Sequence, residues 1–146
     1  MKWFAAVVGL LLLCAAPAWA TLGQSADSVE ADRQAMQGKV EHVALPYYSI
    51  HQITWGGLKV KEFVSPQGKV FGISWQGPTM PNLAQLLGEY YQDFQRSAQG
   101  RPRRRGPIAV HVGDLVVESG GHLRAFSGRA YVTSLVPNTV TYEVVK

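Results

Sequence analysis

The chain has 146 residues, of which 47% are apolar, 16% charged and 10% aromatic, and its formal charge is +4 at pH 7. This composition excludes a disordered chain and a collagen-like repeat, and a single cysteine excludes a disulfide scaffold. The length favours one domain with its own hydrophobic core.

The N-terminal residues 1–20 have the pattern of a cleaved signal peptide. Lys2 gives a positive start, and the apolar run that follows it is about 14 residues long, too short to cross a bilayer core. Ala18 and Ala20 are small residues at the two positions that a signal peptidase reads, so cleavage is expected after Ala20. An uncleaved membrane anchor is the alternative. We therefore predict an exported, periplasmic protein that begins at Thr21 and has no transmembrane segment.

The first predicted element of the mature chain is a short peripheral helix at residues 25–37. Asp27 can cap its N-terminus, with Glu30 three residues later, and Gly38 suits the position just after its end. Few of its side chains are large and apolar, so it should lie at the edge of the fold.

Residues 47–76 predict a three-stranded antiparallel meander. Gly56-Gly57 is a two-residue hairpin signal. The register that it sets pairs Trp55 with Leu58, Ile53 with Val60, and His51 with Glu62. The third strand, at 69–76, has alternating Phe71, Ile73 and Trp75 that are predicted to share one face. The sequence does not decide on which side of the sheet these side chains lie, because a change of one residue in the preceding loop would turn the strand over.

A long amphipathic helix is predicted over residues 80–98, with Thr79 as its N-cap. Its large apolar side chains recur at helical spacing and form one continuous face, which should pack on the sheet: Leu83, Leu86, Leu87, Tyr90, Tyr91 and Phe94.

The C-terminal part contains a basic linker at 101–107 and a second strand region at 108–146. Gly120-Gly121 and Ser127-Gly128 are turn or bulge signals. Two hairpins would align one apolar face; alternatively, Ser127-Gly128 is a bulge within one long strand. The residues of that face would be Val116, Leu123, Ala125, Ala130 and Val132, and a last strand is expected at 139–145. These elements together predict a single α+β domain over residues 21–146.

Four segments resemble a known protein family. They are Y-S-I-H at 48–51, F-V-S-P-Q-G-K-V-F at 63–71, W-Q-G-P-T-M-P-N-L-A-Q-L-L-G at 75–88 and E-S-G-G-H-L-R-A-F-S-G-R-A-Y-V at 118–132. Together they resemble a family of small exported bacterial proteins, the domain of unknown function 2844, over roughly residues 22–137. The resemblance implies a signal peptide and a single exported domain, and it implies no activity, cofactor or catalytic residue.

The motifs of common enzymes are missing from the sequence. It has no P-loop, no G-x-G-x-x-G, no G-x-S-x-G and no H-E-x-x-H, and the mature chain would have no cysteine. His111, Asp114 and His122 come nearest to a metal site, but scattered histidines are the preferred interpretation. We therefore expect no catalytic residue, no metal and no cofactor.

Three functions remain as hypotheses. The first, which we favour, is a non-catalytic binding or envelope-assembly module, with Trp55 and Trp75 as binding candidates if exposed, although burial is the commoner fate of tryptophan in strands. The second is a small enzyme that uses the pair His51 and Glu62. The third is attachment to an anionic envelope component through the arginines of the basic linker, which are Arg101, Arg103, Arg104 and Arg105. The expected partner is a periplasmic protein or an anionic envelope component. Nucleic acid is not expected, because the protein is predicted to be exported and no aromatic residue lies among the arginines to stack on bases.

Overall fold

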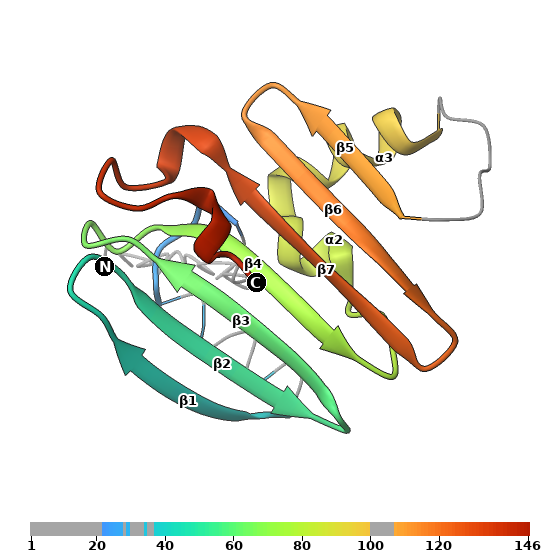
Figure 1. The fold of residues 1–146 in the computed structure, drawn as a ribbon, viewed down its shortest axis with the longest axis horizontal. Helices are drawn as coiled ribbons and strands as arrows, with labels where there is room; N and C mark the ends of the chain where they lie inside the picture. Colours follow the sequence, from blue (N-terminus) through green and yellow to red (C-terminus); the bar gives the residue numbers. More distant parts are fainter. Residues whose placement is uncertain (1–21, 28, 30–33, 35–36, 100–106) are drawn as a thin grey trace, which may run out of the picture.

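The fold is α+β and consists mainly of one sheet. The computed structural model describes residues 22–27, 29, 34, 37–99 and 107–146. Seven antiparallel strands lie side by side in the order β1-β2-β3-β4-β7-β6-β5 (Figure 1). Their bounds are Lys39–Ala44 (β1), Ser49–Trp55 (β2), Leu58–Val64 (β3), Val70–Gly77 (β4), Ile108–Val112 (β5), Leu115–His122 (β6) and Ala125–Val132 (β7).

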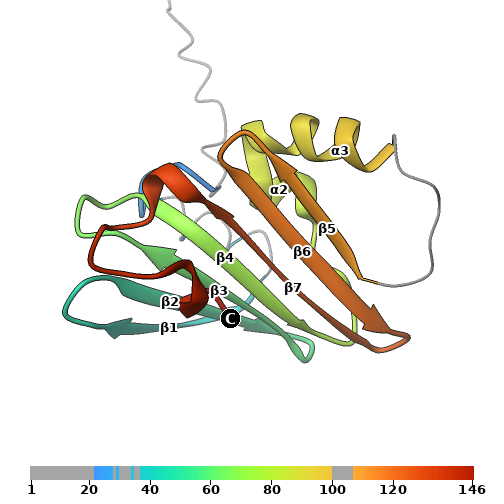
Figure 2. The same ribbon diagram turned by 45° about the horizontal axis from the view of Figure 1, so that its top comes forward.

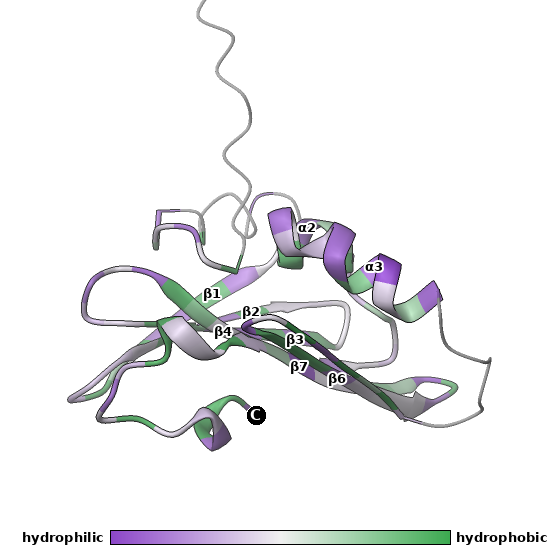
Figure 3. Cartoon of the chain, turned by 90° about the horizontal axis from the view of Figure 1, so that it is seen from above, coloured by the Kyte–Doolittle hydropathy of each residue, from purple (hydrophilic) through white to green (hydrophobic). Residues whose placement is uncertain are grey.

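Different segments of the chain pack on the two faces of the sheet. Figure 3 shows the helices α2 (Leu83–Leu87) and α3 (Tyr91–Gln99) on one side of the sheet and the C-terminal segment on the other. We call these sides the helix face and the C-terminal face. On the helix face, apolar side chains of the sheet pack against Leu86 and Leu87 of α2, and a smaller core on the C-terminal face is built around Phe63 and Val145.

The predicted register of the first hairpin is confirmed. Trp55 lies opposite Leu58, Ile53 opposite Val60, and His51 opposite Glu62. Strand β1, which pairs with β2, was not expected; most of its side chains are exposed, so it lacks the apolar alternation that marks a half-buried strand.

In the third strand of the meander, β4, the side chains of Ile73 and Trp75 lie on the helix face. The expectation that Phe71 shares this face is wrong. Phe63 pairs with Gly72 and the next residue, Val64, pairs with Val70, so Phe71 is an extra residue in a β-bulge. The bulge turns Phe71 to the C-terminal face, where it contacts Phe63 with a ring separation of 6.2 Å.

The predicted long helix is divided into two. Gly88 has φ 51° and ψ −121°, a backbone conformation outside the helical region, and a 3-10 turn at Gly88–Tyr90 (η1) joins α2 to α3. The N-cap is Asn82, whose side-chain oxygen accepts a hydrogen bond from the Gln85 N–H at 3.3 Å, and not Thr79. Leu86 and Leu87 are buried in the core, so the expected apolar face still points to the sheet. Figure 2 shows α2 and α3 at the β5–β6 side of the sheet.

The second strand region contains two hairpins, but their turns are not at the predicted places. They lie between β5 and β6 and at Leu123-Arg124, while Gly120-Gly121 and Ser127-Gly128 lie within paired strands. Because the turn comes at Leu123, this residue is 89% exposed and does not join the core. The predicted face was also wrong for Val116, which lies on the C-terminal face, and for Ala125, which is exposed. Ala130 and Val132 do lie together in the core of the helix face.

The strand expected at 139–145 is not formed. This segment contains a 3-10 turn at Tyr142–Val144 (η3), which follows another at Thr133–Leu135 (η2). The side chain of Val145 is fully buried against Gly72, where a β-carbon would be 2.6 Å from Val145 Cγ2. The segment therefore covers the C-terminal face through side chains and does not extend the sheet.

Leu22, which closely follows the predicted cleavage site, is part of the fold. Leu22 is fully buried, and its N–H donates to the Leu86 carbonyl at 3.0 Å. The helix predicted at 25–37 lies largely outside the described residues, although Val29, which is described, is buried. Within the described part of the chain, no helix is both long enough and apolar enough to span a bilayer.

Candidate functional site

His51 and Glu62 lie side by side in a polar row on the helix face. His42 of β1 continues the row, since it pairs with His51, and the two imidazole rings meet edge to face at 4.5 Å between centroids. The side chain of Glu62 is only 1% exposed. A carboxylate buried to this degree does not reach a substrate in solvent, so the geometry gives the pair a structural place and does not favour the enzyme hypothesis.

The pKa of His51 is lowered from its usual value of 6.5, mainly because burial disfavours the charged ring and secondly because His42 is nearby. From the sequence alone we expected the opposite, with Glu62 raising this pKa. That expectation is wrong because the desolvation of the ring dominates.

The two tryptophans have different environments. Trp75 is 2% exposed and lies in the core, as expected for a strand tryptophan. Trp55 is 51% exposed, which contradicts the expectation of burial. It borders a pocket of about 410 Å³ at the start of α2, together with Met80 and Asn82. The four candidate arginines at 101–105 lie outside the described residues.

A larger concavity lies on the C-terminal face, and we call it the sheet groove. Its volume is about 900 Å³, and it crosses the sheet from β2 to β5, at right angles to the strands. With strands about 4.8 Å apart, five steps between six strands give a length of roughly 24 Å. The size suits an extended molecule better than a compact one.

The walls of the sheet groove are two transverse rows of side chains that the register places on one face. Gln52, Lys61 and Ser74 begin the first row, and Arg129 and Glu118 continue it across β7 and β6. The second row lies two residues further along each strand and consists of Lys59, Gln76, Ser127 and Gly120. Between the rows lie Trp75, Gly128 and Ser119. The side chains of Trp75 and Ser119 belong to the helix face by alternation and Gly128 has none, so the main chain of these residues forms the floor.

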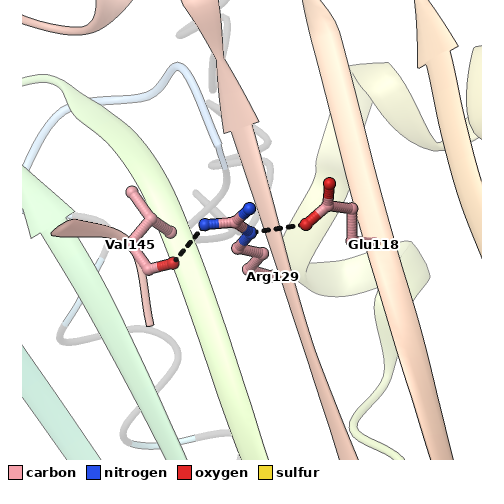
Figure 4. A network of polar contacts seen from close by, with 3 residues as sticks. All are labelled: Glu118, Arg129 and Val145. Carbon is pink, nitrogen blue, oxygen red and sulfur yellow. Dashed lines mark hydrogen bonds and ion pairs between the residues drawn. The ribbon is translucent and has the colours of Figure 1, made fainter. Parts of the chain in front are cut away.

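Arg129 is fixed in the groove wall by two contacts. Its Nε donates to Glu118 Oε2 at 2.6 Å, and its Nη1 donates to the Val145 carbonyl at 3.4 Å (Figure 4). The hydrogen bond to Glu118 is the main reason why the pKa of Arg129 is raised. The guanidinium also lies over the Tyr131 ring, 5.7 Å from its centroid. Arg129 thus connects the sheet with the C-terminal segment and holds a permanent positive charge in the wall.

Positive charge predominates along the sheet groove. Lys59 and Lys61 come from β3, and the Lys61 ammonium donates to the main-chain oxygen of Lys146, which also lines the groove. Arg124, at the β6–β7 turn, lines an adjoining hollow that shares Lys59, Gln76 and Ser127 with the groove. Glu118 is the acidic side chain among the lining residues. The groove can therefore attract and hold an anionic molecule.

The sequence analysis did not identify the sheet groove, although a signal was present. Polar residues alternate with the core residues of three adjacent strands, as in Lys59 and Lys61, Ser74 and Gln76, and Ser127 and Arg129. An alternating polar set indicates a solvent-facing side of a strand, and it becomes a groove only when the strands are placed next to one another. Among the described residues, no three His, Cys, Asp or Glu side chains are grouped as metal ligands would be.

The chain belongs to the family described as protein of unknown function DUF2844, whose profile matches residues 18–145. This confirms the resemblance found in the sequence and extends it at both ends. Neither a search of curated proteins nor a search of solved structures found a match.

Proposed function

We propose that this DUF2844 protein is an exported, non-catalytic binding module of the bacterial envelope, and that the sheet groove is its binding surface. The observation that carries the proposal is the groove of about 900 Å³, with polar and charged side chains along both walls and a floor of sheet main chain. Most of its lining comes from strands that are paired on both sides, so the groove is held rigid before a ligand arrives.

The sequence supports the export part of the proposal. The apolar run and the Ala18-x-Ala20 ending are typical of a signal peptide. Leu22, two residues after the predicted cleavage site, is buried and hydrogen-bonded in the fold, and the family match begins at residue 18, close to that site. An exported protein meets the molecules of the envelope, and an open polar groove can bind one of them, so binding to an envelope molecule is the role that accounts for both features.

An experiment with soluble envelope polymers tests the proposal. Isotope-labelled mature protein is titrated with periplasmic and capsular polysaccharide fractions, and backbone amide signals are followed by NMR. We expect shifts confined to residues along the groove, among them Ser74, Gly120 and Ser127. A bulky substitution in the groove, Ser127→Phe, should abolish them, because Ser127 is exposed and its side chain belongs to the second row of the groove wall.

The matched control is Thr79→Phe, an equal change at an exposed residue beside Trp55. Shifts that survive Ser127→Phe and vanish in Thr79→Phe would place binding at the Trp55 pocket and contradict the proposal. Shifts that vanish only when the four arginines at 101–105 are replaced by Ser would favour attachment through the basic linker.

A further inference from the structure

We infer that the ligand of the sheet groove is a linear polysaccharide that carries carboxylate groups, such as a polyuronate. This inference rests on the proposed function, because it names the ligand class of the same site. Three features of the groove support it: its direction across the strands, the kinds of side chain in its walls, and its charge.

The direction of the sheet groove suits a glycan chain. Each step along the groove passes from one strand to the next, so polar side chains recur about every 4.8 Å. A pyranose ring repeats along a glycan at a similar spacing. An extended ligand of this kind can therefore meet equivalent donors and acceptors at β3, β4, β7 and β6, one sugar at each strand.

The side chains of the walls suit hydroxyl and carboxylate groups. Gln52 and Gln76 each have an amide that both donates and accepts hydrogen bonds, and Ser127 offers an exposed hydroxyl. A peptide would find few main-chain partners here, because the strands beneath the groove already pair with neighbours on both sides. The indole of Trp75, which would be the platform for a neutral sugar, lies on the other face against Gly128.

The charge of the sheet groove selects an anionic glycan over a neutral one. Lys59, Lys61 and Arg129 are spread over β3 and β7, with Arg124 and Lys146 at its margins, and Glu118 is held by Arg129. A guanidinium has five N–H donors, so the contacts of Arg129 with Glu118 and Val145 leave it donors for a ligand. Cations distributed along a groove match carboxylates distributed along a chain, and they give affinity that falls as salt rises.

The experiment is calorimetric titration of the mature protein with a galacturonic acid hexasaccharide, and with maltohexaose as the uncharged chain of the same length. We expect saturable binding of the uronate at low salt, weaker binding at high salt, and no binding of maltohexaose. Lys59→Gln/Lys61→Gln should weaken binding by at least about tenfold. The matched control Arg103→Gln/Arg104→Gln removes the same charge from the basic linker and should leave affinity within about twofold.

A second pair of variants keeps the test independent of folding. Ser127→Glu and Ser127→Gln add side chains of nearly equal size at an exposed strand position, and only the first adds negative charge. Weaker uronate binding by Ser127→Glu than by Ser127→Gln supports charge recognition in the groove. Circular dichroism confirms that each variant is folded.

Several outcomes would overturn the inference. Binding of maltohexaose at the groove, blocked by Ser127→Phe, would leave the proposed function standing and refute the anionic class. Equal loss of affinity in the Arg103/Arg104 control would move the site to the basic linker. Binding to phosphatidylglycerol vesicles without binding to the uronate would identify a lipid surface as the ligand, and no binding of either hexasaccharide would also refute the inference.

Discussion

Gly128 is predicted to be a position in the sheet that does not tolerate a side chain. It lies opposite Trp75, whose ring covers the space that a β-carbon would occupy. A β-carbon at Gly128 would be 2.3 Å from Trp75 Cζ2, 2.6 Å from Trp75 Cε2 and 2.7 Å from the Glu118 carbonyl oxygen. The ring is in a closely packed core, and moving it costs about 2–3 kcal/mol for an overpacked site of this kind.

Gly120→Ala is the matched control, because Gly120 lies in the neighbouring strand with its nearest contact, Pro107 Cβ, at 3.5 Å from a β-carbon. Alanine should fit there and raise stability by about 0.5 kcal/mol, since glycine weakens a strand interior. In urea unfolding followed by circular dichroism, Gly128→Ala should lower the midpoint by roughly 1–2 M relative to wild type.

The clash can be assigned to Trp75 by a double-mutant cycle. In the Gly128→Ala background, Trp75→Leu should cost at least about 1 kcal/mol less than in wild type, because it removes the overlapping ring. If Gly128→Ala is as stable as Gly120→Ala, or if the two changes are additive, the packing argument is refuted.

Three further predictions concern other parts of the chain. If residues 1–20 are a signal peptide, intact-mass measurement of the native protein should give a chain that starts at Thr21, and retention of Met1 would contradict this. Arg129→Gln should lower stability by about 0.5–1 kcal/mol, less so in 1 M salt, and Arg129→Lys should not restore it, because lysine cannot reproduce the planar donor pair; full rescue by lysine would argue against this geometry. Stability should fall as the pH drops below about 6.5, with part of this fall absent in His51→Gln.

Local patterns predicted the first hairpin well. The two glycines fixed the loop length, and loop length fixes the register of an antiparallel pair, so the pairing of His51 with Glu62 followed from the sequence. The apolar face of residues 83–94 was equally local, and its inward direction was predicted, although the break at Gly88 was not.

Features that depend on distant residues were not predicted. The bulge at Phe71 is defined by the pairing of β4 with β3, and the second core that Phe71 joins also needs Val145 from the far end of the chain. The segment at 139–145 has strand-like residues, but both edges of the sheet are elsewhere, at β1 and β5. The sheet groove needs β4 and β7 as neighbours, although they are separated in sequence by the helices and two further strands.

The pH dependence shows how burial reverses a prediction made from pairing alone. Opposite Glu62, His51 was expected to hold its proton more tightly, but its half-buried ring and the adjacent His42 lower its pKa instead. Between the unfolded pKa near 6.5 and the lower folded value, the unfolded chain binds more protons, so acid favours unfolding. We expect the free energy of unfolding to decrease from pH 7.5 to pH 5.5, and by less in His51→Gln than in wild type. His122→Gln, at an exposed histidine far across the sheet, is the control for the loss of a histidine as such. A larger decrease in His51→Gln than in wild type would show that Glu62 dominates and raises the pKa of His51, and an unchanged slope would show that its pKa is the same in both states; either result refutes the argument from desolvation.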